Sequence, residues 1–495
     1  MRTNTTKLLV RNVSYLGIGQ VASTALGILL ATVIGRALEP AQLGILYIVS
    51  GITGFVTIVI EWGQGTYLVR ELARGRIDEP ELIGSALLLR LATTVFSSAV
   101  AIVIALALGY NGQIAELTLL AMIVGVPYTL FGLFDCSFRG RDRMDIGALA
   151  NIVGKAVTVA AIAVALRFGG GLAEVILMGG IGGISTLLVA GIAALRLNIS
   201  VKAPVMKTLR ELFWHGAPIA AFSLMIASQP FLEILLLSKL AGSAVVGWYG
   251  ASRTIFGIVT SPALITVAAT FPELSRKSLS LPDLRRMIDA TGRVLFIAAA
   301  FASSALFLFA DHIVAIIYGH GRFEQTAAIL RVTAIFIPLL FFTYLLASAI
   351  LAVGRNKVLA VINIVRLAVF VALSWLLIGY WQQQFGNGAI AVVITAGVVE
   401  MPMLIAYLIL LPRGAVGSIT MLNGFRACVA SLCTVVPLSM LQPLGLLYLI
   451  PLFAVLFAVT AMVTRLVLPS DLRLAREIAR SGLLAPQATK SAPDV

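Results

Sequence analysis

Several ionisable side chains stand inside long apolar stretches of this sequence. They include the cations Arg253, Lys155 and Arg366 and the carboxylates Glu233 and Glu400. A charge inside a bilayer costs on the order of 2.5–3.5 kcal/mol by insertion scales, so such residues normally face water or a charged partner. Because a guanidinium binds phosphate oxygens through a planar fork and stays protonated, Arg253 is the strongest candidate for holding a phosphate group.

Each of these residues also has a purely structural interpretation. Arg253 could form a structural ion pair with Glu233 or Glu400. These carboxylates could instead bind a proton or Na⁺, or they could only balance the charge of Arg253. Lys155 and Arg366 could flank an anionic substrate on the cytosolic side, or their side chains could extend to that surface. The sequence alone leaves these alternatives open.

Further cations lie near the ends of apolar stretches. Arg36 and Lys239 end the first and seventh stretches and could guard an outer opening, although a solvated helix end favoured by the C-terminal dipole also accounts for them. Arg90 lies closer to the start of its stretch and is expected to extend to the membrane surface.

The composition indicates an integral membrane protein. Of its 495 residues, 60% are hydrophobic and 12% are charged, and the mean hydropathy is +1.02, whereas soluble domains are roughly one-quarter charged. The net charge of +14 is spread in short clusters between apolar runs without a nucleic-acid-binding motif. The three cysteines lack metal-ligand spacing, and no Walker motif is present. Nucleic acid, metal and ATP hydrolysis are therefore not expected.

About fourteen apolar runs approach the ~20 residues that cross a bilayer. Six lie within residues 12–195, a polar cytosolic linker follows at 196–212, and six more lie within 213–411. Two extra runs lie within 412–468, followed by a cytosolic tail at 469–495. The sequence therefore predicts an all-α membrane protein with two six-helix bundles and two additional C-terminal helices.

The distribution of Lys and Arg predicts the orientation. These residues gather in segments on the side of the N-terminus, so both termini are expected in the cytosol. Three segments mix Arg with Leu and Ile and are expected to bind the lipids of the inner leaflet. They are Thr66–Glu81, Pro272–Ile288 and Leu474–Leu484.

Two pairs of segments repeat along the chain. A shift of 203 residues places Gly35–Gly44 on Ser238–Gly247, with Arg36 on Lys239 and Gly44 on Gly247. Farther on, Gly140–Val157 is similar to Gly354–Val369, which aligns Asn151 with Asn363. The pairs favour two homologous halves in the same orientation, related by an axis along the membrane normal.

The first hairpin resembles that of bacterial polysaccharide flippases, the Wzx-type members of the multidrug/oligosaccharidyl-lipid/polysaccharide (MOP) exporter superfamily. The resemblance covers residues 7 to about 411. The motifs that carry it are Gly35, Arg36, Leu38, Pro40 and Gly44; Glu61 with Gly63; Arg70–Arg74; Gly247 with Tyr249; Phe271–Ser275; and Gly354 with Arg355. Glu61 and Glu233 stand where such families usually carry Asp, which makes Glu61 a further ion-coupling candidate beside Glu233 and Glu400.

The resemblance implies a V-shaped pair of bundles around a lumen that opens alternately to each side of the bacterial inner membrane. It implies a transporter, not an enzyme, which passes a polyprenyl-pyrophosphate-linked oligosaccharide outward for surface polysaccharide synthesis. Arg253, Lys155 and Arg366, with Arg36 and Lys239 at the outer ends, are the candidate substrate contacts. No cofactor is expected beyond an H⁺ or Na⁺ gradient, and a polysaccharide polymerase and chain-length proteins are possible partners.

Two other functions remain open at this point. A multidrug antiporter of the same superfamily should prefer cationic drugs, and the excess of Arg and Lys within the apolar stretches argues against it. A membrane polymerase or ligase needs an outer catalytic loop. The longest outward segment, near Asp311–Arg331, has no evident catalytic cluster.

Overall fold

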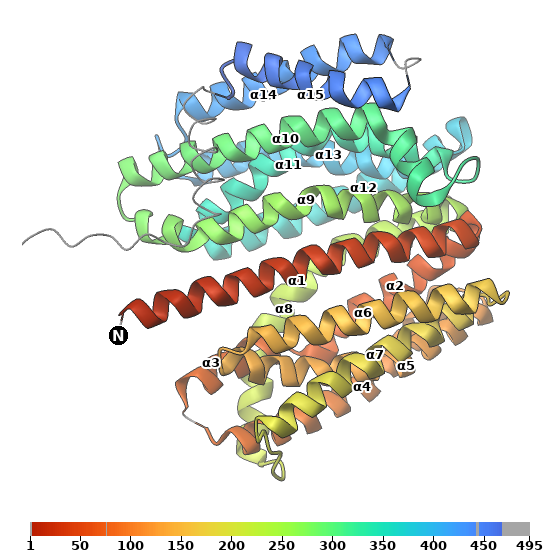
Figure 1. Ribbon diagram of the computed structural model, residues 1–495, viewed down its shortest axis with the longest axis vertical. Coiled ribbons are helices and arrows are strands. Elements are labelled where there is room, and N and C mark those ends of the chain that lie inside the picture. The colour runs from red at the N-terminus through yellow and green to blue at the C-terminus, as the bar shows by residue number, and fades with distance from the viewer. Residues whose placement is uncertain (1, 76, 442–444, 468–495) are drawn as a thin grey trace, which may run out of the picture. The chain divides into compact units, whose positions relative to one another are not determined.

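The computed structural model describes residues 2–75, 77–441 and 445–467, with side chains from residue 19 onward. All regular secondary structure in these ranges is α-helical (Figure 1). The helices are α1 Arg2–Ala37, α2 Pro40–Glu61, α3 Gln64–Arg74, α4 Glu79–Ala107, α5 Gly112–Gly140, α6 Met144–Arg167, α7 Leu172–Arg196, α8 Met206–Leu240, α9 Ser243–Lys277, α10 Leu281–Tyr318, α11 Glu324–Ala352, α12 Asn356–Phe385, α13 Gly388–Leu410, α14 Ser418–Met440 and α15 Leu446–Val463.

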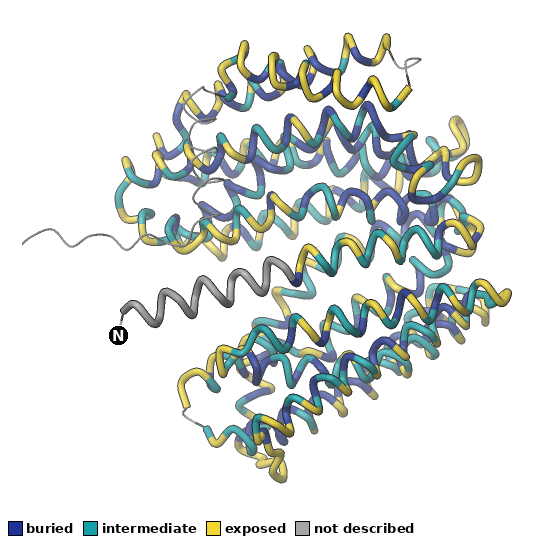
Figure 2. Tube along the Cα trace, in the orientation of Figure 1, coloured by how far each residue is buried: buried dark blue, intermediate teal, exposed yellow. Residues whose placement is uncertain are grey.

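The described helices include 14 segments that are long and apolar enough to cross a membrane. Helices α2 and α3 together form one of these segments, Pro40–Arg74. Large apolar side chains on the helices remain exposed, among them Val95, Phe96 and Val103 of α4, and exposed residues recur along many helices in Figure 2. Such surfaces suit contact with lipid. The predicted number of spans is confirmed.

The first segment predicted to bind lipid, Thr66–Glu81, comprises most of the short helix α3 and the start of α4. Trp62 and Gly63 both have positive φ angles and end α2 sharply before α3 begins. Tyr67 and Leu68 of α3 are buried, whereas Arg70 and Arg74 lie on its exposed side. The second predicted segment is divided between the end of α9 and the start of α10. The third, Leu474–Leu484, and the predicted tail lie outside the described residues.

The chain packs into two compact units. The first contains residues 1–255, 311–329 and 367–395, and the second contains residues 256–310, 330–366 and 396–495. Each of the helices α9 to α13 contributes residues to both units. The predicted division at residues 196–212 stays a prediction.

Within the first unit, α5 packs on α4 and α7, and α6 packs on α1 and α7 (Figure 1). A buried cluster joins α3, α4, α5 and α8. Its members are Tyr67, Leu68, Leu82, Ala86, Leu89, Leu133, Cys136 and Leu212. These contacts hold α1, α5 and α6, which carry one of the sites described below.

The segment before α8 is fixed to the start of α4. The backbone N–H of Lys202 donates to the carbonyl of Pro80 over 3.0 Å, and its ammonium lies 2.6 Å from Asp78. The hydrogen bond from the ammonium to the Asp78 carboxylate raises the pKa of the Lys202 side chain. Arg141 binds Glu79 at 2.6 Å and the carbonyl of Leu197 at 2.8 Å. The predicted linker is therefore held along the first unit for part of its length.

Helices α2 and α9 approach closely at a pair of glycines. A Cβ on Gly44 would lie 1.8 Å from the backbone oxygen of Ser243, and one on Gly247 would lie 1.9 Å from that of Pro40. Pro40 and Ser243 are related by the same 203-residue shift as Gly44 and Gly247. The repeat found in the sequence therefore corresponds to a reciprocal contact in space.

Replacing Gly44 by alanine should lower the melting temperature of the purified protein in detergent. The added Cβ would overlap the Ser243 carbonyl, and overpacking of this kind costs typically about 1–3 kcal/mol. Gly54→Ala on the same helix is the matched control, because no described atom other than the adjacent backbone of α2 lies within 4 Å of its new Cβ and alanine favours the helix by about 1 kcal/mol. A Gly44→Ala protein that melts no lower than Gly54→Ala would contradict the close packing.

Candidate functional site

A buried carboxylate and an exposed guanidinium meet between α8 and α9. Glu233 is 2% exposed and accepts hydrogen bonds from the Tyr249 hydroxyl at 2.7 Å and the Gln229 amide at 3.0 Å. The Nη2 atom of Arg253 lies 3.8 Å from Oε2 of Glu233, and the Arg253 side chain is 42% exposed. The predicted ion pair with Glu233 is thus present, and it leaves much of the guanidinium accessible.

Helical spacing explains this cluster. Gln229 and Glu233 are four residues apart on α8, and Tyr249 and Arg253 are four apart on α9. Residues with this spacing share one face of a helix, so each helix presents two polar side chains at neighbouring turns. The roles of Gln229 and Tyr249 were not predicted, although their spacing from the two charged residues was a signal.

Lys155 reaches from α6 to α1. Its Nζ donates to the hydroxyl of Ser23 over 3.0 Å and packs near Gly27, where a Cβ would lie 3.4 Å from Nζ, in ordinary van der Waals contact. Among the described residues, no carboxylate lies within 4.0 Å of this ammonium. Lys155 therefore carries a positive charge within the first unit that is held by a neutral partner.

The second unit contains its own ion pair. Arg366 of α12 lies 3.3 Å from Glu400 of α13, and both side chains are mostly buried. The Nε of Arg366 also lies 3.4 Å from the Asn363 amide oxygen. Glu400 therefore balances Arg366. Glu233, one of the two partners predicted for Arg253, lies beside it in the first unit.

The two asparagines aligned by the second sequence repeat make the same local bond. The amide of Asn151 donates to the carbonyl of Gly147 over 3.0 Å, and that of Asn363 donates to Leu359 over 2.8 Å, each four residues back on its helix. The following cations differ, since Lys155 binds a hydroxyl and Arg366 binds a carboxylate.

Arg36 and Lys239 each lie in the last turn of a helix, α1 and α8 respectively. Arg36 donates to the carbonyl of Ile316 near the end of α10 over 2.6 Å. Lys239 lies 3.6 Å from the centre of the Tyr110 ring just after α4, and the Tyr110 hydroxyl binds Ser238. Each cation lies at the C-terminal end of its own helix, where positive charge is electrostatically favoured.

The prediction that Arg90 extends to the membrane surface is wrong. It is 2% exposed and donates to the carbonyl of Thr129 on α5 over 2.7 Å. Gly132 provides the space, since a Cβ there would lie 2.7 Å from the guanidinium. Glu61, by contrast, is exposed at the end of α2.

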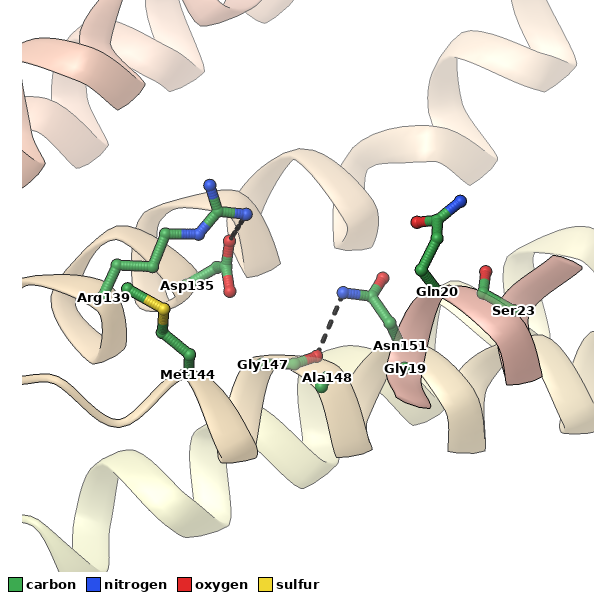
Figure 3. Close-up of a pocket in the computed structure, with 9 residues that line it drawn as sticks. All are labelled: Gly19, Gln20, Ser23, Asp135, Arg139, Met144, Gly147, Ala148 and Asn151. Carbon is green, nitrogen blue, oxygen red and sulfur yellow. Dashed lines mark hydrogen bonds and ion pairs between the residues drawn. The ribbon is translucent and has the colours of Figure 1, made fainter. Parts of the chain in front are cut away.

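A polar pocket of about 290 Å³ lies between α1, α5 and α6 (Figure 3). We call it the α1/α5/α6 pocket. Its lining residues are Gly19, Gln20, Ser23, Asp135, Arg139, Met144, Gly147, Ala148 and Asn151. Arg139 and Asp135 form an ion pair of 2.5 Å inside it. None of the side chains that line this pocket was predicted as a site residue; the four-residue spacing of Asp135 and Arg139 was the available signal.

Several solved transporter structures share the fold. The lipid II flippase MurJ in an inward closed conformation matches 92% of this chain and 99% of its own, with a TM-score of 0.71 and 11% identity. An inward-facing multidrug resistance MATE family transporter of the MOP superfamily matches 80% of this chain and 97% of its own, with a TM-score of 0.66 and 15% identity. An outward-facing structure of such a transporter has a TM-score of 0.57 at 16% identity, covering 81% and 95%. The predicted MOP-type fold is confirmed.

No curated protein matches the chain. The sequence profile of the family described as "Polysaccharide biosynthesis protein" matches residues 9–278. This range is more than half of the chain and contains Lys155, Glu233 and Arg253, whereas Arg366 and Glu400 lie beyond it. The predicted resemblance is confirmed: the chain belongs to this polysaccharide biosynthesis family and has the fold of the MOP superfamily.

Proposed function

We propose that this protein moves polyprenyl-pyrophosphate-linked oligosaccharides from the cytosolic to the outer face of a bacterial inner membrane for surface polysaccharide synthesis. The observation that carries the proposal is the exposed guanidinium of Arg253, which lies ten residues after the start of the membrane helix α9 and pairs with the buried Glu233. Family membership points to polysaccharide synthesis, and a flippase named for lipid II has the same fold. Both facts support a lipid-linked sugar as the substrate.

Arg253 is suited to bind a pyrophosphate. Its guanidinium stays charged and can bind two phosphate oxygens at once. The Glu233 carboxylate accepts hydrogen bonds from Tyr249 and Gln229. It can therefore orient Arg253 while part of the guanidinium stays accessible to a substrate. Lys155 and Arg366 are further candidate contacts for the anion, and Arg36 and Lys239 are candidates at the outer ends. The protein makes and breaks no covalent bond in this proposal.

Arg366 and Glu400 suggest how an ion gradient could drive transport. A proton or Na⁺ on Glu400 would weaken its attraction to Arg366 and free the guanidinium for an anionic substrate. Release of the ion would restore the pair and favour release of the substrate. Glu233 and Glu61 are the other candidates for ion binding.

The MOP fold also suits an ion-coupled multidrug antiporter. Of the candidate carboxylates, Glu233 and Glu400 each lie within 4.0 Å of an arginine, which disfavours binding of a cationic drug at either of them. An enzyme that polymerises or ligates glycans is less well supported, because the predicted outward segment Asp311–Arg331 is mostly helix: α10 ends at Tyr318 and α11 begins at Glu324.

Arg253→Ala should reduce export by about 10- to 100-fold, because hydrogen bonds to charged groups contribute about 1.5–3 kcal/mol. Arg253→Lys should retain part of the activity, since it keeps the charge but loses the fork. Export is measured as surface polysaccharide and as lipid-linked repeat units retained on the cytosolic face of a strain lacking its own copy. Arg167→Ala, at an exposed arginine that ends α6, is the control. Normal export by both Arg253 variants would sink the proposal.

Glu400→Gln should abolish the response of export to an imposed gradient, because an amide keeps the shape of the side chain but does not bind a proton or balance Arg366. The measurement compares export in vesicles with and without H⁺ or Na⁺ gradients. Glu116→Gln, at an exposed carboxylate of α5, serves as the matched control. A Glu400→Gln protein with the full gradient response would exclude Glu400 as the coupling site.

The proposed orientation places both termini in the cytosol. In a variant without the three native cysteines, Asn111→Cys before α5 should react with an impermeant maleimide in intact spheroplasts. Asp142→Cys, between α5 and α6, should react only after permeabilisation. The reverse labelling pattern would show the opposite orientation.

A further inference from the structure

We propose that the α1/α5/α6 pocket binds the hydroxyl groups of the sugar that is attached to the pyrophosphate of the substrate. This inference rests on the proposed function and adds where the glycan is held. The pocket therefore acts as a specificity site that is separate from Arg253.

The side chains of the pocket match the hydrogen bonding of a sugar. Gln20, Asn151 and Ser23 can both donate and accept, Asp135 accepts and Arg139 donates. A sugar hydroxyl also donates and accepts, so it can use every member of this set. Phosphate oxygens only accept and would leave Asp135 facing a like charge.

The pocket is close to neutral. Arg139 and Asp135 are the ionisable residues that line it within the described part of the chain, and their side chains pair at 2.5 Å. This ion pair cancels most of the charge that would attract a phosphate or a metal cation, while the carboxylate and the half-exposed guanidinium retain further hydrogen-bonding positions.

Small residues create the space for the polar groups. A Cβ on Gly147 would lie 2.1 Å from the Asp135 carboxylate, and one on Gly19 would lie 3.1 Å from the Cβ of Ala148. These glycines let α5 and α1 approach α6. The resulting volume, about 290 Å³, is at the lower end of the ~300–1,000 Å³ of small-molecule sites and suits a single sugar better than a whole repeat unit.

The order of residues along α6 places the sugar beside a phosphate. Gly147, Asn151 and Lys155 follow at four-residue intervals and share one face. Lys155 binds Ser23, which also lines the pocket. A phosphate bound by Lys155 would therefore be one turn from a sugar bound at Asn151, as their covalent linkage requires. Figure 3 shows Asn151 and Ser23 at the same end of the pocket.

The test measures binding of the free oligosaccharide repeat unit, released from the host's surface polysaccharide, to the purified full-length protein by ligand-detected NMR. Asn151→Ala and Gln20→Ala should each weaken binding by about tenfold, the equivalent of one hydrogen bond. Gln113→Ala, an exposed amide at the other end of α5, should leave the affinity unchanged. Arg253→Ala should also leave glycan affinity unchanged while weakening binding of inorganic pyrophosphate.

The possible outcomes separate this inference from the proposed function. Unchanged glycan affinity in both Asn151→Ala and Gln20→Ala overturns the sugar site, even if export by the wild type confirms the flippase. Binding of pyrophosphate or Na⁺ in the pocket, together with a failure of the glycan to bind there, also overturns the sugar site. If the wild type exports no lipid-linked glycan but these two variants lose glycan binding, the sugar site stands and the proposed function fails.

Discussion

A charge inside a membrane helix needs water or a partner, and this requirement organises the candidate site. Arg253 and Arg366 each meet a carboxylate, Lys155 meets a hydroxyl, and Arg90 meets a backbone carbonyl. The partners differ in what they leave available. The Arg90 side chain is buried, whereas Arg253 pairs with the buried Glu233 carboxylate and remains partly exposed. An oriented, exposed guanidinium can bind an anion with little further loss of side-chain entropy.

The sequence was sufficient to predict the all-helical fold and the number of spans, because the bilayer imposes a length on each apolar run. It also revealed the 203-residue repeat, because Gly44 and Gly247 are required by the same close contact. The choice of ion-pair partner was not predictable in the same way. Hydropathy does not determine the rotation of a helix about its axis. The pairing of Glu400 with Arg366 of α12, in place of the predicted pairing with Arg253, was therefore not foreseen.

Arg90 shows why distance from a helix end is an incomplete guide. Its place near the start of an apolar run suggested a side chain that extends to the membrane surface. Gly132 on the neighbouring helix α5 instead makes room for the guanidinium inside the protein. The α1/α5/α6 pocket was missed for a related reason. Its polar residues come from three helices and include ordinary amides, which become a site only when small residues allow those helices to approach.

The contact between Gly44 and Gly247 has a further consequence for the origin of the chain. A contact in which each half offers the same surface to the other is the arrangement found in a symmetric homodimer. The common shift of 203 residues from Pro40 to Ser243 and from Gly44 to Gly247 is the sequence pattern that duplication of one such half produces. Each glycine is constrained separately by this one contact, because a Cβ on Gly44 would lie 1.8 Å from the Ser243 oxygen and one on Gly247 would lie 1.9 Å from the Pro40 oxygen.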